Sequence, residues 1–142
     1  MVKQISVLIE NEPGQIYKPI KVLGDAGIDL CAVSVGDAKG FGVLRMITRD
    51  NDNAINALKK AGCTVNLTDL IGAVVENEPG GLASLLSAFE QESINVEYFY
   101  SFLPRKDEEA IMFFKIKDKD KDIVLDKLKK HNVRLVDEKA LA

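Results

Sequence analysis

The chain of 142 residues contains no tryptophan, a single histidine, two cysteines and no long apolar run. A helix that crosses a bilayer needs about 20 consecutive apolar residues, so no membrane span is expected. Cys31 and Cys63 lie far apart in the sequence, whereas a structural metal site usually needs more ligands at tighter spacing. We therefore expect reduced thiols and no bound metal ion.

The single histidine also limits the chemistry that the chain can perform. His131 follows two lysines at the expected end of a helix, where a basic side chain interacts favourably with the helix dipole. With one histidine and no sign of two paired acids, general acid–base catalysis is hard to build. We expect that the chain is not an enzyme, with no catalytic residue and no cofactor.

Basic residues do not gather into one stripe. The net charge is −3 and the sequence pI is about 5.2. Nucleic-acid-binding proteins present a basic patch to the phosphate backbone, so a nucleic acid is not expected as a partner. The first residues lack the apolar core of a signal peptide, and we therefore expect a cytoplasmic protein.

One short segment occurs twice. Residues 10–16 read Glu-Asn-Glu-Pro-Gly-Gln-Ile, and residues 76–82, which lie 66 positions later, read Glu-Asn-Glu-Pro-Gly-Gly-Leu. A fixed internal period indicates repeated structural units. We expect two domains, residues 1–68 and 69–142. A unit of about 70 residues is marginally stable alone, so each should pack against the other, against a second chain, or both.

Apolar spacing predicts the same order of elements in both halves. In the first half the expected strands are 4–9, 28–35, 43–48 and 63–67, the helices are 16–26 and 54–61, and a turn covers 36–40. In the second half the expected strands are 70–75, 94–103, 110–116 and 133–136, the helices are 82–89 and 123–128, and a turn covers 104–109. Asp50 is among the candidates for capping a helix.

This order predicts an α+β fold of two tandem ferredoxin-like βαββαβ units. Right-handed crossovers with a hairpin between them give an antiparallel sheet with helices on one face. In the second half, however, Tyr98 and Tyr100 alternate with Phe99, so both faces of that strand carry apolar side chains. A sheet with one wet face should alternate more cleanly. We expect that another unit covers the bare face or an edge strand.

The repeated Pro-Gly segment has a chemistry of its own. A helix that begins there leaves its first N–H groups without intrahelical partners and carries a partial positive charge. A small carboxylate can dock on those groups, while Asn11 or Asn77 and Glu12 or Glu78 can receive an ammonium group. From the residues alone a second interpretation stays open, because Asn before a helix often bonds to its own backbone.

The surroundings of both segments resemble the ACT domain, a small-molecule-sensing module of amino-acid metabolism. The family pattern is an apolar strand, Asn or Asp, one residue, Pro-Gly, an apolar residue, and a helix that ends in Gly-Ile-Asn-Ile. The first half reads Val-Leu-Ile-Glu-Asn-Glu-Pro-Gly-Gln-Ile and then Ala-Gly-Ile-Asp-Leu. The second reads Ala-Val-Val-Glu-Asn-Glu-Pro-Gly-Gly-Leu and then Glu-Ser-Ile-Asn-Val. The resemblance covers nearly the whole chain and implies a free-standing protein of two tandem ACT domains.

The resemblance also implies where a ligand would bind. In amino-acid-binding ACT domains, the Asn before Pro-Gly and the Asn of Ile-Asn-Ile often contact the effector from two neighbouring units. The chain departs from this pattern at Asp29, which implies two non-equivalent sites, one with Asn11 and Asn95 and one with Asn77 and Asp29. The implied ligand-binding residues are Asn11, Glu12, Pro13, Gly14, Gln15, Ile16, Asp29, Leu30, Asn77, Glu78, Pro79, Gly80, Gly81, Leu82, Asn95 and Val96.

Gln15 and Gly81 occupy matching positions in the two copies. Glycine there either leaves space for a larger ligand or is neutral variation. The predicted function is an amino-acid-sensing regulatory protein, expected to be a homodimer that modulates a metabolic enzyme or regulator. The alternative is a structural interaction module whose ligand sites have decayed, which the Asp29 departure favours.

Two other functions fit the sequence less well. RNA-recognition domains share the βαββαβ order, and aromatic side chains could stack on bases, but their signature motif is absent and the net charge is negative. Small ferredoxin-like hydrolases bind phosphate with a loop arginine, and no arginine lies next to either Pro-Gly in the sequence.

Overall fold

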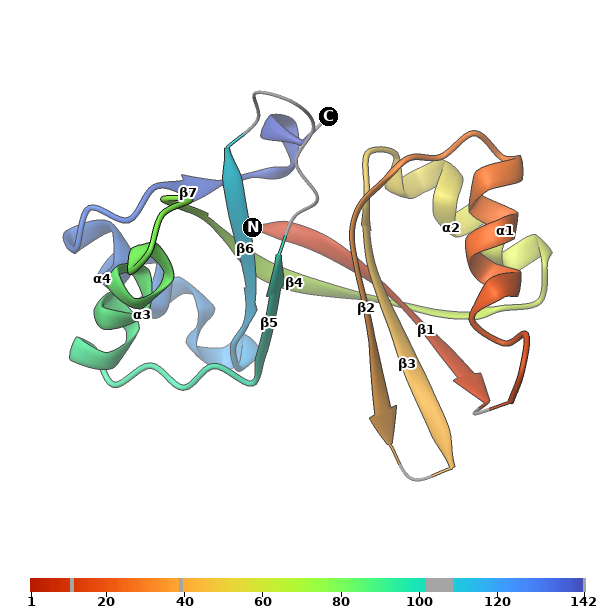
Figure 1. The fold of residues 1–142 in the computed structure, drawn as a ribbon, viewed down its shortest axis with the longest axis horizontal. Helices are drawn as coiled ribbons and strands as arrows, with labels where there is room; N and C mark the ends of the chain where they lie inside the picture. The colour runs from red at the N-terminus through yellow and green to blue at the C-terminus, as the bar shows by residue number, and fades with distance from the viewer. Residues whose placement is uncertain (11, 39, 102–108, 142) are drawn as a thin grey trace. The chain divides into compact units, whose positions relative to one another are not determined.

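The structure, a computed structural model, describes residues 1–10, 12–38, 40–101 and 109–141. The chain divides into two compact units (Figure 1). The N-terminal unit comprises Lys3–Thr68 and the chain end from Leu141, and the C-terminal unit comprises Met1–Val2 and Asp69–Ala140. Each unit has its own apolar core.

The N-terminal unit has a four-stranded sheet and two helices. Its elements are β1 (Val2–Glu10), α1 (Tyr17–Asp25), β2 (Leu30–Ala38), β3 (Phe41–Thr48), α2 (Asn51–Lys60) and the first part of β4 (Thr64–Val75). The strand order is β2-β3-β1-β4, and β3 pairs antiparallel with β1 and with β2. This is the strand order of a ferredoxin-like unit, as the sequence predicts.

Alternation along β1 builds the core of this unit. Ile5 and Val7 are fully buried, whereas Leu8 between Val7 and Ile9 is 51% exposed. The buried residues pack with Leu23 of α1 and with α2. Each large apolar side chain buried in this way stabilises the fold by about 1.5–3 kcal/mol. The face that carries Leu8 is therefore the one away from the helices, and whether another unit covers it stays a prediction.

Helix α2 begins and ends as its local sequence predicts. The Asp50 carboxylate accepts a hydrogen bond from the Asn53 backbone N–H at 3.2 Å, which satisfies one of the free amides at the helix start. Lys59 and Lys60 lie in the last turn, where positive charge interacts favourably with the helix dipole. Residues 51–60 need little tertiary information to form this helix.

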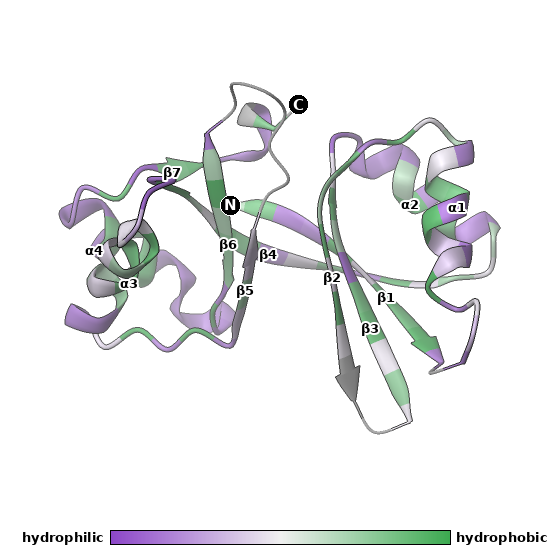
Figure 2. Cartoon of the chain, viewed as in Figure 1, coloured by the Kyte–Doolittle hydropathy of each residue, from purple (hydrophilic) through white to green (hydrophobic). Residues whose placement is uncertain are grey.

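The C-terminal unit repeats the architecture. Its elements are the second part of β4, α3 (Gly81–Gln91), β5 (Tyr98–Ser101), β6 (Ala110–Lys115), a short 3-10 turn (Asp118–Asp120), α4 (Lys121–Lys130), β7 (Leu135–Val136) and a second 3-10 turn (Glu138–Ala140). The strand order is β7-β4-β6-β5. Apolar residues follow one another along β6, which Figure 2 colours green over most of its length. Phe114 of β6 is fully buried, and its ring lies 4.6 Å from that of Phe89 on α3.

The boundary between the halves differs from the prediction. The sequence predicts two strands, 63–67 and 70–75, but the structure has one strand of 12 residues, β4. Neither Thr68 nor Asp69, the residues at the predicted boundary, is a glycine or proline that would interrupt the extended backbone. One strand therefore supplies the last strand of the N-terminal unit and the first strand of the C-terminal unit.

Two strands of the C-terminal unit are shorter than predicted. β5 covers Tyr98–Ser101 rather than 94–103, and its register with β6 runs from Tyr98 opposite Lys115 to Ser101 opposite Met112. Residues 102–108 lie outside the described part, so the end of the predicted strand and most of the predicted turn are not tested. β7 covers only Leu135–Val136, because only these two residues pair with β4. In the described part of the chain, no helix is long and apolar enough to cross a membrane.

Candidate functional site

The two Pro-Gly segments fold into the same turn. We call them the first corner (Glu10–Ile16, in which Asn11 lies outside the described residues) and the second corner (Glu76–Leu82). Gly14 and Gly80 both have φ +87°, a conformation that glycine adopts without the strain of a side chain. Three pairs of backbone hydrogen bonds also match. Glu12 N–H donates to Glu10 O, and Glu78 N–H to Glu76 O, both at 2.9 Å. Gln15 N–H donates to Glu12 O at 3.3 Å and Gly81 N–H to Glu78 O at 3.0 Å, while Lys18 N–H donates to Gly14 O at 3.2 Å and Ser84 N–H to Gly80 O at 2.9 Å.

Both helices start without a side-chain cap. In neither α1 nor α3 does a capping side chain accept a hydrogen bond from a backbone N–H at the helix start. Within the described part of the chain, the backbone N–H groups of Tyr17, Leu82 and Ala83 also donate to no backbone carbonyl. The second interpretation of this corner was that Asn77 caps its own helix, and the structure shows no such hydrogen bond. These amides carry the partial positive charge of the helix start and remain available to an acceptor.

Gly81 has a packing role that was not predicted from the sequence. It is buried, and a Cβ atom built on it would lie 2.0 Å from the backbone oxygen of Glu76. The space expected for a larger ligand is thus already filled by the protein backbone, so that expectation was wrong. The matching residue of the first corner is Gln15, and α1 begins only at Tyr17, two positions later than α3 in the repeat.

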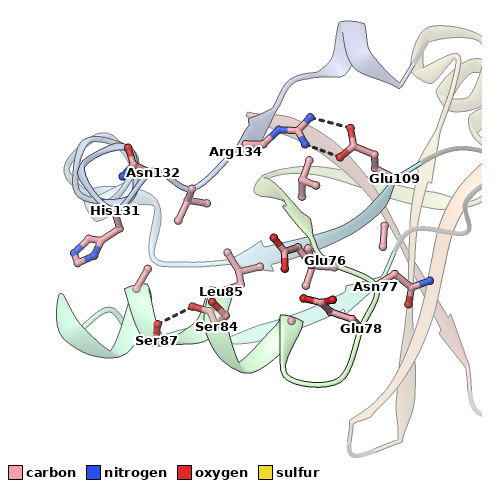
Figure 3. Close-up of a pocket in the computed structure, with 16 residues that line it drawn as sticks. Glu76, Asn77, Glu78, Ser84, Leu85, Ser87, Glu109, His131, Asn132 and Arg134 are labelled. Atoms are coloured by element: carbon pink, nitrogen blue, oxygen red, sulfur yellow. Dashed lines mark hydrogen bonds and ion pairs between the residues drawn. The ribbon is translucent and has the colours of Figure 1, made fainter.

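A pocket of about 680 Å³ lies within the C-terminal unit, beside the second corner (Figure 3). One side of α3, the segment Glu109–Ala110 and the connection His131–Arg134 between α4 and β7 complete its walls. Of the sequence-predicted site residues, the pocket brings together Asn77, Glu78 and Gly81. In Figure 3 the Asn77 side chain is at the rim and points away from Ser84 and Ser87.

Side-chain contacts hold the connection His131–Arg134 at both ends. Arg134 donates two hydrogen bonds to the Glu109 carboxylate, at 2.6 and 2.8 Å, and this contact lowers the pKa of Glu109. His131 Nε2 lies 2.9 Å from Glu92 Oε1. The hydrogen bond from His131, with a further contribution from the charge of Lys127, lowers the pKa of Glu92.

Glu78 has a raised pKa, in contrast to the lowered pKa values of Glu92 and Glu109. A side-chain hydrogen bond between Glu76 and Glu78, together with the repulsion of their charges, raises the pKa of Glu78. No lysine or arginine forms an ion pair with either carboxylate in the described part of the chain. The second corner thus carries two neighbouring acids next to a helix start.

The other predicted site residues that the structure describes do not line this pocket. Asp29 is exposed and lies 3.3 Å from Nε of Arg49, so its charge is already partnered within the N-terminal unit. Leu30 begins β2. Asn95 is exposed in the connection before β5, whereas Val96 packs against the core of the C-terminal unit. Glu12, Pro13, Gly14, Pro79 and Gly80 are exposed.

Arg134, Ser84 and His131 line the pocket although the sequence did not predict them as site residues. Arg134 lies far from both Pro-Gly segments along the chain. The predicted topology contained a usable signal, because the last strand of a βαββαβ unit pairs with the first. The Val74 N–H accordingly donates to the Arg134 carbonyl at 2.9 Å, which brings Arg134 to the end of β4. Among the described residues, no three His, Cys, Asp or Glu side chains are grouped so that they could hold a metal ion.

The fold and the repeated corner define a tandem ferredoxin-like α+β protein. The family model for the ACT domain pair matches residues 1–142, and the chain belongs to this family. No curated protein matches the chain in sequence.

Solved structures agree with this assignment. The protein BT0572 from Bacteroides thetaiotaomicron is 34% identical, with a TM-score of 0.81, and the match covers 95% of this chain and 91% of that one. The ligand-free regulatory subunit of aspartate kinase from Thermus thermophilus is 18% identical, with a TM-score of 0.59 and 90% of each chain covered. The latter likeness shows the fold alone.

Proposed function

We propose that the chain is a regulatory protein that binds an amino acid or a related small carboxylate at ACT–ACT interfaces and so changes its contact with a metabolic enzyme or regulator. The observation that carries the proposal is the uncapped helix start, which occurs at both corners although α1 begins two positions later in the repeat than α3. Membership of the ACT domain pair family supports a small-molecule-sensing regulatory role.

The chemistry of a corner suits a zwitterion. The free N–H groups of Leu82 and Ala83 can donate to a ligand carboxylate, since a helix start favours negative charge without any cationic side chain. Asn77 is exposed and, within the described part of the chain, makes no hydrogen bond through its side chain, so it is available to an ammonium or carboxylate group. The first corner has the same backbone geometry and offers the Tyr17 amide.

A ligand that binds at an interface between units can change the arrangement of those units, and thereby the contact with the metabolic enzyme or regulator. A ligand shifts an equilibrium between two arrangements only by its different affinity for them. We keep the domain bounds 1–68 and 69–142, the homodimer and the cytoplasmic location as parts of this proposal.

The two corners are proposed to differ in selectivity because Asp29 stands where the ACT pattern has Asn. The guanidinium of Arg49, 3.3 Å from Asp29, offsets the aspartate charge. Asp29 therefore repels a ligand carboxylate less than an isolated aspartate would.

A structural interaction module with decayed ligand sites is the second candidate. The Asp29–Arg49 contact favours it, because it gives Asp29 a role in the N-terminal unit without any ligand.

A thermal-shift screen of the whole chain against the twenty amino acids and related 2-oxo and aryl acids separates the two candidates. A ligand present at 100 times its dissociation constant stabilises the native state by about 2.7 kcal/mol, which raises Tm by several degrees. A rise with one compound or a few related compounds supports the sensor. No rise with any of them supports the structural module.

A further inference from the structure

The pocket of the C-terminal unit is chemically distinct from the free amides at the second corner. Its walls include Gly81 and Ser84, but the residues with free amides, Leu82 and Ala83, are not among them. The Gly81 N–H, which does line the pocket, already donates to the Glu78 carbonyl at 3.0 Å. The pocket therefore offers no free main-chain donor of α3 to an anion.

Apolar side chains form one part of the pocket lining, which we call the floor. Leu85 and Ala88 of α3 are buried, and Val74, Val75 and Val133 are half-buried around them. The volume of about 680 Å³ falls within the range of roughly 300–1,000 Å³ that small-molecule sites occupy. Ser84 and Ser87 add hydroxyl groups from α3.

The charges of the lining determine the sign of the group that fits. Arg134 is the one lysine or arginine in the described lining, and Glu109 already engages it through two hydrogen bonds. Glu76 and Glu78 have no such basic partner in the described residues. The lining thus has an excess of negative charge next to an apolar floor.

The arrangement of the acidic residues does not suit a metal ion. No group of three or more His, Cys, Asp or Glu among the described residues is arranged to hold a metal ion. A divalent metal would also gain nothing from the apolar floor, because it prefers several oxygen ligands. An organic cation satisfies both the carboxylates and the floor.

We propose that this pocket is a second ligand site, which binds a small organic amine: its ammonium group contacts Glu76 and Glu78, and its short apolar chain lies against Leu85 and Ala88. The His131–Glu92 hydrogen bond and the Arg134–Glu109 ion pair hold the wall formed by residues 131–134 in place. This inference goes beyond the proposed function, since its ligand needs no carboxylate and lies in a pocket that the free amides of Leu82 and Ala83 do not line.

The test uses n-butylammonium chloride as the probe and sodium butyrate as its matched anion, both titrated into the ¹⁵N-labelled whole chain. Butylammonium should shift the amide signals of Ser84, Ala88 and Val133 in a saturable way, with a dissociation constant on the order of millimolar for so small a ligand. Butyrate should not shift them. Added salt should weaken the binding, because exposed charges are screened.

Glu76→Gln removes one carboxylate at nearly constant volume, and Ser84→Gln narrows the pocket without changing its charge. Glu76→Gln should weaken butylammonium binding by about two- to fivefold, as is typical of an exposed ion pair. Glu90→Gln is the matched control, because Glu90 is exposed on α3 and does not line the pocket. The same spectra show whether each variant is folded.

Three results would overturn the proposal: no saturable shift, equal shifts with butyrate, or equal weakening by Glu90→Gln and Glu76→Gln. The outcome is distinguishable from that of the proposed function although both use Glu78, since butylammonium has no carboxylate for the free amides of Leu82 and Ala83. If amino acids bind but butylammonium does not, only this second site is lost. If butylammonium binds but no carboxylate does, the second site stands and the sensor proposal fails.

Discussion

A Cβ atom on Gly81 would lie 2.0 Å from the carbonyl oxygen of Glu76, far inside the distance that two such atoms can tolerate. The contact lets α3 begin directly against the end of β4 and fixes the form of the second corner. Because the obstacle is backbone rather than a flexible side chain, a substitution cannot be accommodated by a rotamer change. Gly81 is therefore required for packing, whatever ligand binds nearby.

Gly81→Ala should destabilise the chain by about 1–3 kcal/mol, since β4 and α3 must move apart to admit the methyl group. Urea unfolding of both proteins measures the difference. Gly24→Ala is the matched control: Gly24 lies in α1, and a Cβ atom there meets nothing within 4 Å. This control should stabilise the chain by roughly 0.5–1 kcal/mol, because alanine favours a helix over glycine. Equal effects of the two substitutions would contradict the packing role.

Asp50→Ala should cost about 1 kcal/mol of folding free energy, because it removes the acceptor of the Asn53 N–H at the start of α2. Asp50→Ser retains a capping oxygen and should recover most of the loss. Chemical denaturation of the three proteins gives the comparison. A serine variant as unstable as the alanine variant would show that the cap is not the cause.

The stability of the C-terminal unit should depend on Glu92 at acid pH. Its contact with His131 lowers the folded-state pKa of Glu92 below the ordinary value of 4.5. A carboxyl group with a lowered pKa contributes stability above its unfolded pKa, and that contribution is lost as the pH falls through the folded pKa. The Glu92→Gln variant should thus be less stable than the natural chain at neutral pH, and the gap should close below about pH 4.5.

Urea midpoints measured across that pH range test the dependence on Glu92. Glu90→Gln serves as the control, because Glu90 is exposed and forms no ion pair in the described part of the chain. A gap between Glu92→Gln and the natural chain that stays constant with pH would exclude the proposed contribution of Glu92.

Asp29→Asn should change ligand binding if the two proposed sites differ. Calorimetric titration with an effector found in the thermal screen should resolve two classes of site in the natural chain, and the substitution should bring their affinities together. Asp25→Asn is a suitable control, because Asp25 is exposed and, among the described residues, its ion pair is with Lys21 one helical turn away. One class of site that Asp29→Asn leaves unchanged would refute the asymmetry.

Much of the fold could be predicted because its signals are local. The four helices and most strands follow from apolar spacing, and Asp50 marks the start of α2 through a contact three residues away. The repeated corner is likewise encoded within seven residues, and its two copies form matching hydrogen bonds. The shortness of β5 and β7 was not predictable in this way, since a strand extends only as far as its neighbour pairs with it.

The sequence by itself determined the duplication, the ferredoxin-like order of elements and the chemistry of the two helix starts, because neighbouring residues decide all three. Only the tertiary structure decided that β4 runs unbroken through Thr68 and Asp69, that Gly81 lies against the Glu76 carbonyl, and that Arg134 reaches the pocket beside the second corner. These features depend on residues brought together by strand pairing and close packing. Apolar spacing along the chain does not specify such contacts.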